Sequence, residues 1–148
     1  MPDRSIEELA ALDPLVGAWS MQAVFPTAGP SDLRGRTVFE WALGGRFLVQ
    51  RAEVPHPAAP DLIAMIGPDR GSGGFLQHYF DSRGVVRLYS MTLGDGVWTL
   101  ERHAEPPDFS QRFIGTFSDD GDTIAGVWEA ANDGSDWEHD FDLVYRRI

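Results

Sequence analysis

From Trp19 onward the chain consists of short runs in which apolar and polar residues alternate. Alternation with a period of two is typical of a β-strand that buries one face, because successive side chains point to opposite sides. Clusters of Gly, Pro, Asp and Asn separate these runs at nine places, and such clusters mark turns. The pattern therefore predicts ten strands, at 17–25, 33–42, 45–53, 61–67, 74–81, 85–93, 97–103, 111–117, 123–130 and 136–147.

The N-terminal segment has a different, helical pattern. Ser5 and Glu8 have the spacing of a capping box, in which each side chain satisfies a backbone N–H at the start of a helix. An apolar stripe of helical period follows the cap: Ile6, Leu9, Ala10 and Leu12. Pro14 lacks a backbone N–H and is expected to end the helix. We therefore predict one short helix before the first strand.

The connectors between the predicted strands are too short for crossover helices. Parallel neighbours need crossovers of about a dozen residues or more, so consecutive strands are expected to pair antiparallel, as a meander. Ten consecutive strands either split into two sheets or close, and closure removes both exposed edges. We expect an all-β fold, a ten-stranded antiparallel up-and-down β-barrel with a short N-terminal helix, as a single domain over residues 1–148.

Charge and composition limit the classes of partner and the chemistry expected of the protein. The 148 residues carry 12 basic side chains, all of them Arg, against 23 Asp plus Glu, and the formal net charge of −11 disfavours nucleic acid and anionic membranes. The absence of Cys excludes disulfides, thiolate nucleophiles and Cys-ligated metals. The N-terminal segment has acids where a secretory signal has bases, so we expect a cytoplasmic protein. The oligomeric state, including a dimer, stays open.

The last predicted strand shows which face is expected inside. One side of this strand carries mostly aromatic and apolar side chains: Trp137, His139, Phe141, Leu143 and Tyr145. The other side carries charged side chains: Glu138, Asp140, Asp142 and Arg146. The aromatic side is expected to face the interior. Eight strands can be filled by their own side chains, whereas ten enclose a wider space. The sequence therefore predicts an internal cavity.

Leu15-Val16-Gly17-Ala18-Trp19 resembles the Gly-x-Trp opening of the first strand in calycins, the superfamily of lipocalins, fatty-acid-binding proteins and nitrobindins. The resemblance implies a basic residue across that Trp, here Arg146 or Arg147. The strand count is similar to the ten-stranded branch, although the segment 26–32 is too short for the two-helix lid of fatty-acid-binding proteins. The run from Phe39 to Arg51 also resembles an uncharacterised bacterial lipocalin-like family without an established activity.

Candidate ligand-binding residues are the polar side chains that interrupt the aromatic faces, together with two indoles: Arg51, His78, Tyr79, Tyr89, Arg102, Trp128, Trp137 and His139. The resemblance to fatty-acid-binding barrels implies that Arg51 and Arg102 hold a ligand carboxylate, and the alternative is a pair of rim arginines bound to nearby glutamates. The resemblance to nitrobindins implies that His139 ligates haem. The alternative there is a hydrogen-bonded cavity histidine.

No catalytic template is present: the chain has no G-x-S-x-G elbow, P-loop, dinucleotide fingerprint or H-E-x-x-H. We therefore expect a protein that binds a small hydrophobic or amphipathic molecule in a central cavity, without a cofactor or a bound metal. Three alternatives stay open. They are a haem protein that uses His139 and handles nitric oxide or peroxide, a small lyase or isomerase inside the barrel, and a solid barrel that acts through its surface.

Overall fold

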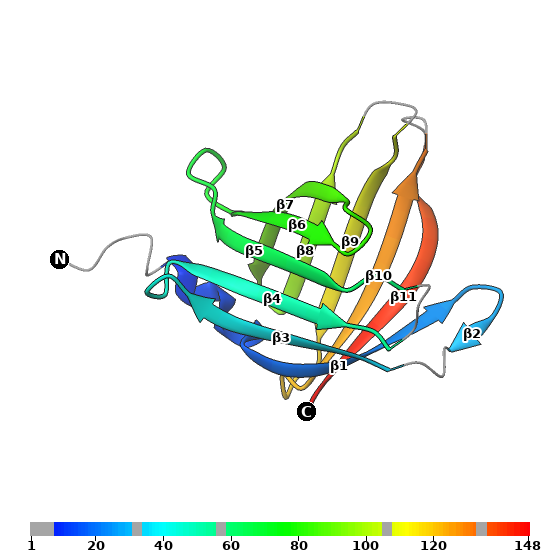
Figure 1. The fold of residues 1–148 in the computed structure, drawn as a ribbon, viewed down its shortest axis with the longest axis horizontal. Helices are drawn as coiled ribbons and strands as arrows, with labels where there is room; N and C mark the ends of the chain where they lie inside the picture. The colour runs from blue at the N-terminus through cyan, green and yellow to red at the C-terminus, as the bar shows by residue number, and fades with distance from the viewer. Residues whose placement is uncertain (1–7, 31–33, 56–58, 105–107, 133–135) are drawn as a thin grey trace.

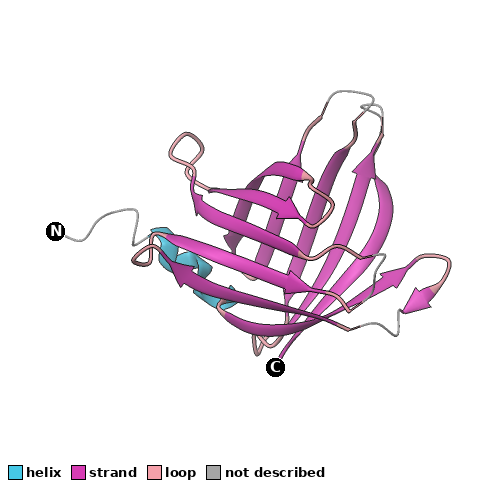
Figure 2. Cartoon of the chain, viewed as in Figure 1, coloured by secondary structure: helices cyan, strands magenta, loops and turns pink. Residues whose placement is uncertain are grey.

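The structure, a computed structural model, describes residues 8–30, 34–55, 59–104, 108–132 and 136–148. A 3₁₀-helix, η1 (Ala10–Leu15), precedes the strands, which are coloured in chain order in Figure 1. The strands are β1 (Gly17–Phe25), β2 (Gly29–Pro30), β3 (Gly35–Ala42), β4 (Phe47–Glu53), β5 (Leu62–Pro68), β6 (Phe75–Asp81), β7 (Val86–Gly94), β8 (Val97–Arg102), β9 (Ser110–Phe117), β10 (Thr123–Ala131) and β11 (Glu138–Arg147). Loops and turns make up the rest of the described chain (Figure 2).

The strands form one closed antiparallel barrel. Each strand from β3 to β10 pairs with the next in sequence, β1 pairs with β3, and β11 returns to pair with β1. The prediction of a ten-stranded meander is confirmed, and the predicted strand bounds differ from the observed ones by at most two residues. The addition is β2, a two-residue strand that pairs only with the end of β1. A closed wall leaves no long unpaired edge.

One end of the barrel is filled by the helix. Leu12 and Leu15 of η1 are completely buried and belong to the same hydrophobic cluster as Trp19 of β1. The helix differs from the expected one in its position, because Pro14 lies inside it rather than after it. Proline has a backbone φ that fits a helix, and η1 ends one residue later. Ser5 of the predicted cap and Ile6 of the predicted apolar stripe lie outside the described residues.

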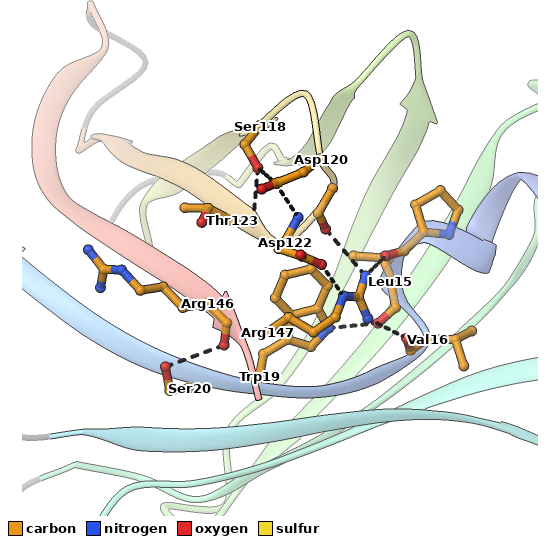
Figure 3. Close-up of polar contacts among 12 residues, drawn as sticks. Leu15, Val16, Trp19, Ser20, Ser118, Asp120, Asp122, Thr123, Arg146 and Arg147 are labelled. Atoms are coloured by element: carbon orange, nitrogen blue, oxygen red, sulfur yellow. Dashed lines mark hydrogen bonds and ion pairs between the residues drawn. The ribbon is translucent and has the colours of Figure 1, made fainter.

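Arg147 closes this end from the opposite terminus (Figure 3). Its guanidinium carbon lies 4.1 Å from the centre of the Trp19 ring, and the indole Nε1 of Trp19 donates to the carbonyl of Leu15 at 2.8 Å. Arg147 also donates to the carbonyl of Val16 at 2.9 Å. The expected basic residue across the first-strand Trp is therefore Arg147, whereas Arg146 donates to Gln22.

A β-bulge in β11 changes the alternation of its side chains. Trp128 pairs with Phe141 but the next residue, Glu129, pairs with His139, so Asp140 is left without an opposite residue. Phe141 and the alternate residues after it face the interior as expected, whereas the residues before the bulge face the other way. The expected inward orientation of His139 and Trp137 is therefore wrong.

Candidate ligand-binding site

A cavity of about 400 Å³ lies inside the barrel. Its apolar wall comes from strands on all sides of the barrel: Met21, Leu62, Trp98, Leu100, Trp128, Phe141 and Leu143. The aromatic side chains of this wall and of the core contact one another edge to face, with 6.1 Å between the ring centres of Tyr89 and Trp128 and 4.8 Å between those of Trp98 and Phe113. Such contacts restrict the rings. The space that the strand count predicts inside the barrel is present in this structure, beside the aromatic core.

Tyr89 lines the cavity from β7. It is 2 % exposed, and its hydroxyl donates to Oε1 of Gln111 at 2.8 Å. Burial raises the pKa of Tyr89, and burial likewise raises the pKa of Tyr145. Both phenols consequently stay protonated at neutral pH and act as hydrogen-bond donors, not as bases.

A second polar group stands where β6 turns into β7. The Asp81 carboxylate is inaccessible to solvent, accepts the Tyr79 hydroxyl at 2.7 Å and pairs with the Arg83 guanidinium at 2.6 Å. The hydrogen bond from Arg83 holds the pKa of Asp81 well below its usual range. Burial and the neighbouring Asp81 raise the pKa of Tyr79. Arg83 and Tyr79 both line the cavity, so Asp81 fixes two lining side chains and neutralises the cation.

Arg87 lines the cavity from the inward face of β7. Its guanidinium carbon lies 5.3 Å from the centre of the Phe109 ring, and Arg102 stacks on the same ring at 5.5 Å. Arg102 forms an ion pair with Asp108 at 2.8 Å. Within the described part of the chain, by contrast, no carboxylate forms an ion pair with Arg87.

Two buried polar atoms on cavity-lining residues have no hydrogen-bond partner. They are Oε1 of Gln77 and Nε1 of Trp98. Gln50, which lines the same cavity, differs because its amide donates to the hydroxyl of Thr37 at 3.2 Å. Buried polar groups in proteins are nearly always paired, so the two atoms mark a place where a polar partner is missing.

The structure brings together three of the eight predicted site residues. Tyr79, Tyr89 and Trp128 line the cavity. Arg102 lies beside it, stacked on Phe109, which itself lines the cavity. Among the predicted residues these four are the ones near the interior.

The other four predicted residues lie on the outer surface. Arg51 is exposed and pairs with Glu40 across β3 and β4, so the predicted carboxylate pair of Arg51 and Arg102 does not form. His78 is exposed because its neighbours Gln77 and Tyr79 hold the inward positions of β6.

The β-bulge in β11 explains why the remaining two predicted residues, Trp137 and His139, face outward. Trp137 packs under the Arg112 guanidinium at 4.5 Å, on the outer side of the wall. His139 is 45 % exposed and its Nε2 lies 2.8 Å from Oδ1 of Asp142. Neither side chain lines the cavity.

Sequence reasoning missed Gln77, Arg83 and Arg87 as lining residues. Gln77 and Arg87 alternate along their strands with residues that face outward. If the sequence had shown that Gln77 and Tyr79 face inward on β6, their cross-strand partners Tyr89 and Arg87 would have followed as inward residues of β7. Arg83 lies in a turn, where alternation gives no information. The sequence feature that could have pointed to Arg83 is its position two residues after Asp81 in a tight turn, a spacing at which the two side chains can pair.

The cavity residues do not fit a haem. None of the side chains that line it is a histidine, and His139 faces outward. The part of the chain that the structure describes also contains no cluster of side chains able to hold a metal ion. His56 lies outside that part. Among the described helical residues, none forms a helix long and apolar enough to cross a membrane.

Comparison with known proteins supports the fold. No protein-family model matches the chain, and no curated protein matches it in sequence. The chain is similar to the crystal structure of Rv2717c from M. tuberculosis, with a TM-score of 0.64 over 95% of this chain and 97% of that one, at 19% sequence identity. Similarity at this level of identity concerns the fold alone. The protein is thus a closed antiparallel β-barrel whose fold resembles that of Rv2717c.

Proposed function

We propose that this protein binds one small hydrophobic or amphipathic molecule in the central cavity of its barrel. The observation that carries the proposal is the cavity itself. Its volume of about 400 Å³ lies within the range of about 300–1,000 Å³ that is usual for small-molecule sites. Its wall is mostly apolar and aromatic, with a few polar groups that converge on the same space, which is the usual composition of such sites.

The energetics favour an occupied cavity. The lining rings are fixed by contacts with other rings and the barrel is closed, so the site is formed before a ligand arrives. A pre-formed site requires little ordering on binding. Each apolar Å² that a ligand removes from water contributes about 25 cal/mol. The lining side chains also gain dispersion contacts that an unfilled space lacks.

The alternatives receive less support. A haem protein that uses His139 needs that imidazole inside the barrel, and it lies outside. A lyase or isomerase needs an acid or base with a matched pKa, whereas the pKa values of Tyr79, Tyr89 and Tyr145 are raised away from neutrality. The net charge of −11 supports the proposal that neither nucleic acid nor an anionic membrane is the partner.

N-phenyl-1-naphthylamine, a neutral apolar dye that fluoresces when removed from water, tests the proposal. We expect wild-type protein to enhance its fluorescence, saturating at one molecule per chain. Leu143→Trp fills the cavity and abolishes the enhancement, because Leu143 lines it. The matched control is Val127→Trp, which adds the same ring to an exposed position on β10 and keeps binding.

Thermal unfolding of both variants checks that they are folded. Wild-type protein without dye enhancement would contradict the proposal. Equal binding by the two folded variants would also contradict it, because the dye would then lie elsewhere than in the cavity.

A further inference from the structure

Gln77 requires a hydrogen-bond partner that the described residues do not supply. Its side chain is on the inward face of β6, the residue is 3 % exposed, and Oε1 is buried without a partner. An amide has a donor end and an acceptor end. A hydroxyl both donates and accepts, so it satisfies Gln77 in either orientation of the amide.

The rest of the inner cavity shows that this requirement is local. Gln50, on the inward face of β4, already donates to Thr37. Tyr89 already donates to Gln111. Trp98 is the other lining residue with an unpartnered polar atom, and its indole N–H is a donor. Trp98 stands opposite Leu93, four residues along β7 from Tyr89, the residue opposite Gln77, so the two unpartnered atoms belong to separate positions on the wall.

Arg87 supplies a charge for the other end of an occupant. The other arginines at this part of the wall form ion pairs, Arg83 with Asp81 and Arg102 with Asp108. Arg87 helps to lower the pKa of Asp108, but within the described residues it makes no ion-pair contact of its own. Among the described residues that line the cavity, the carboxylate is Asp140, at the β11 bulge, and it is exposed. Arg87 is half-buried against Phe109. A half-buried guanidinium favours a carboxylate, which it binds through two parallel hydrogen bonds.

The register of β6 and β7 gives the separation of the two groups. Gln77 stands opposite Tyr89, and Arg87 is the next inward residue along β7. Two residues of strand span about 7 Å. Tyr89, the residue opposite Gln77, packs its ring against that of Trp128 with 6.1 Å between the ring centres, and both rings line the cavity. A planar apolar group fits against this wall.

From this arrangement, and on the basis of the function proposed above, we infer that the ligand is a two-ended amphiphile: a carboxylic acid that pairs with Arg87, an apolar ring or chain along the aromatic wall, and a hydroxyl that meets Gln77. Binding involves no covalent step. The hydroxyl at the inner end distinguishes this class from a simple apolar acid, which would leave Gln77 unsatisfied.

Three compounds of nearly equal size test separately whether the carboxylate and the hydroxyl of a ligand contribute to binding. 3-(4-Hydroxyphenyl)propionate has both polar ends, 3-phenylpropionate has only the acid, and 4-propylphenol has only the hydroxyl. Calorimetric titration of the wild-type protein is expected to give the tightest binding for the first compound. Removal of either polar end is expected to weaken binding about tenfold.

Variants assign each end to its residue. Gln77→Leu should abolish the preference for the hydroxylated acid over 3-phenylpropionate, whereas Arg87→Met should abolish the preference over 4-propylphenol and leave 4-propylphenol binding unchanged. Arg51→Met, at an exposed arginine outside the cavity, is the matched control and should change none of the affinities.

Equal affinities of the wild-type protein for the three compounds would overturn the inference, as would variants that keep both preferences. If N-phenyl-1-naphthylamine still binds in the cavity in that case, the proposed function stands and only the ligand class is wrong. If neither the dye nor any of the three compounds binds, both proposals are wrong.

Discussion

Arg147 joins three parts of the chain at the closed end of the barrel. It stacks on Trp19, donates to the carbonyls of Pro14 and Val16, and pairs with Asp122 in the turn before β10. Arg147→Ala removes the cation–π contact and these hydrogen bonds together, and is expected to lower the free energy of unfolding by about 2–3 kcal/mol. Urea unfolding measures the change.

The neighbouring Arg146 is the control for that measurement. It is exposed and donates to Oε1 of Gln22 at 3.3 Å, so Arg146→Ala is expected to change stability by at most about 0.5 kcal/mol. Equal losses in the two variants would show that Arg147 has no special role.

Asp81 makes stability depend on pH. Its pKa in the folded protein lies below the value of about 3.9 in an unfolded chain, so the folded state binds fewer protons at acid pH. The contribution of Asp81 is complete well above that value and is lost as pH falls from it toward the folded pKa.

The substitution Asp81→Asn tests this dependence. We expect the variant to be less stable than wild type by about 2 kcal/mol at pH 7, because it loses charged hydrogen bonds to Tyr79 and Arg83. The difference should shrink between pH 5 and pH 3 in urea unfolding at each pH. A difference that is constant over this range would contradict the assignment.

At the scale of the elements, alternation predicted each strand but gave the wrong orientation before the bulge in β11. A bulge needs one extra residue opposite a partner strand, and neither Glu138 nor Asp140 differs in type from ordinary surface residues. The inward placement of Phe141 could be predicted, and the outward placement of His139 could not. Arg87 was missed for a different reason, because a cation on an inward strand position contradicts the usual hydrophobic alternation.

Two glycines in adjacent strands make room for one core ring. Gly115 and Gly126 stand opposite each other in β9 and β10, and a Cβ on Gly126 would lie 2.5 Å from the Phe113 ring and 2.7 Å from the carbonyl of Leu143. Gly126→Ala is therefore expected to destabilise the protein by about 1–3 kcal/mol, through displacement of Phe113. Thermal or urea unfolding measures it.

Gly94, at the end of β7, provides the comparison. A Cβ there would have no atom within 4 Å, so Gly94→Ala should change stability by at most about 0.5 kcal/mol. If Gly126→Ala were equally neutral, the close packing of Phe113 against β10 would be wrong.

For the whole molecule, the closed barrel determines that a cavity exists, and individual side chains determine what it can hold. The short connectors were sufficient to predict closure and the number of strands, because they permit only antiparallel neighbours. The contents of the cavity could be predicted only in part. Tyr79, Tyr89 and Trp128 were among the predicted residues, although alternation left open whether Tyr79 or His78 faces inward, whereas Arg83 reaches the cavity from a turn.

The five tryptophans provide indole N–H signals that report directly on whether a molecule binds inside the barrel. Trp98 and Trp128 line the cavity, Trp19 lies under Arg147 at the closed end, and Trp137 packs against Arg112 on the outer wall. Titration of ¹⁵N-labelled protein with N-phenyl-1-naphthylamine, followed by the indole N–H resonances, should shift Trp98 and Trp128 and leave Trp19 and Trp137 in place. Shifts at Trp137 with Trp98 and Trp128 unchanged would contradict a ligand in the cavity.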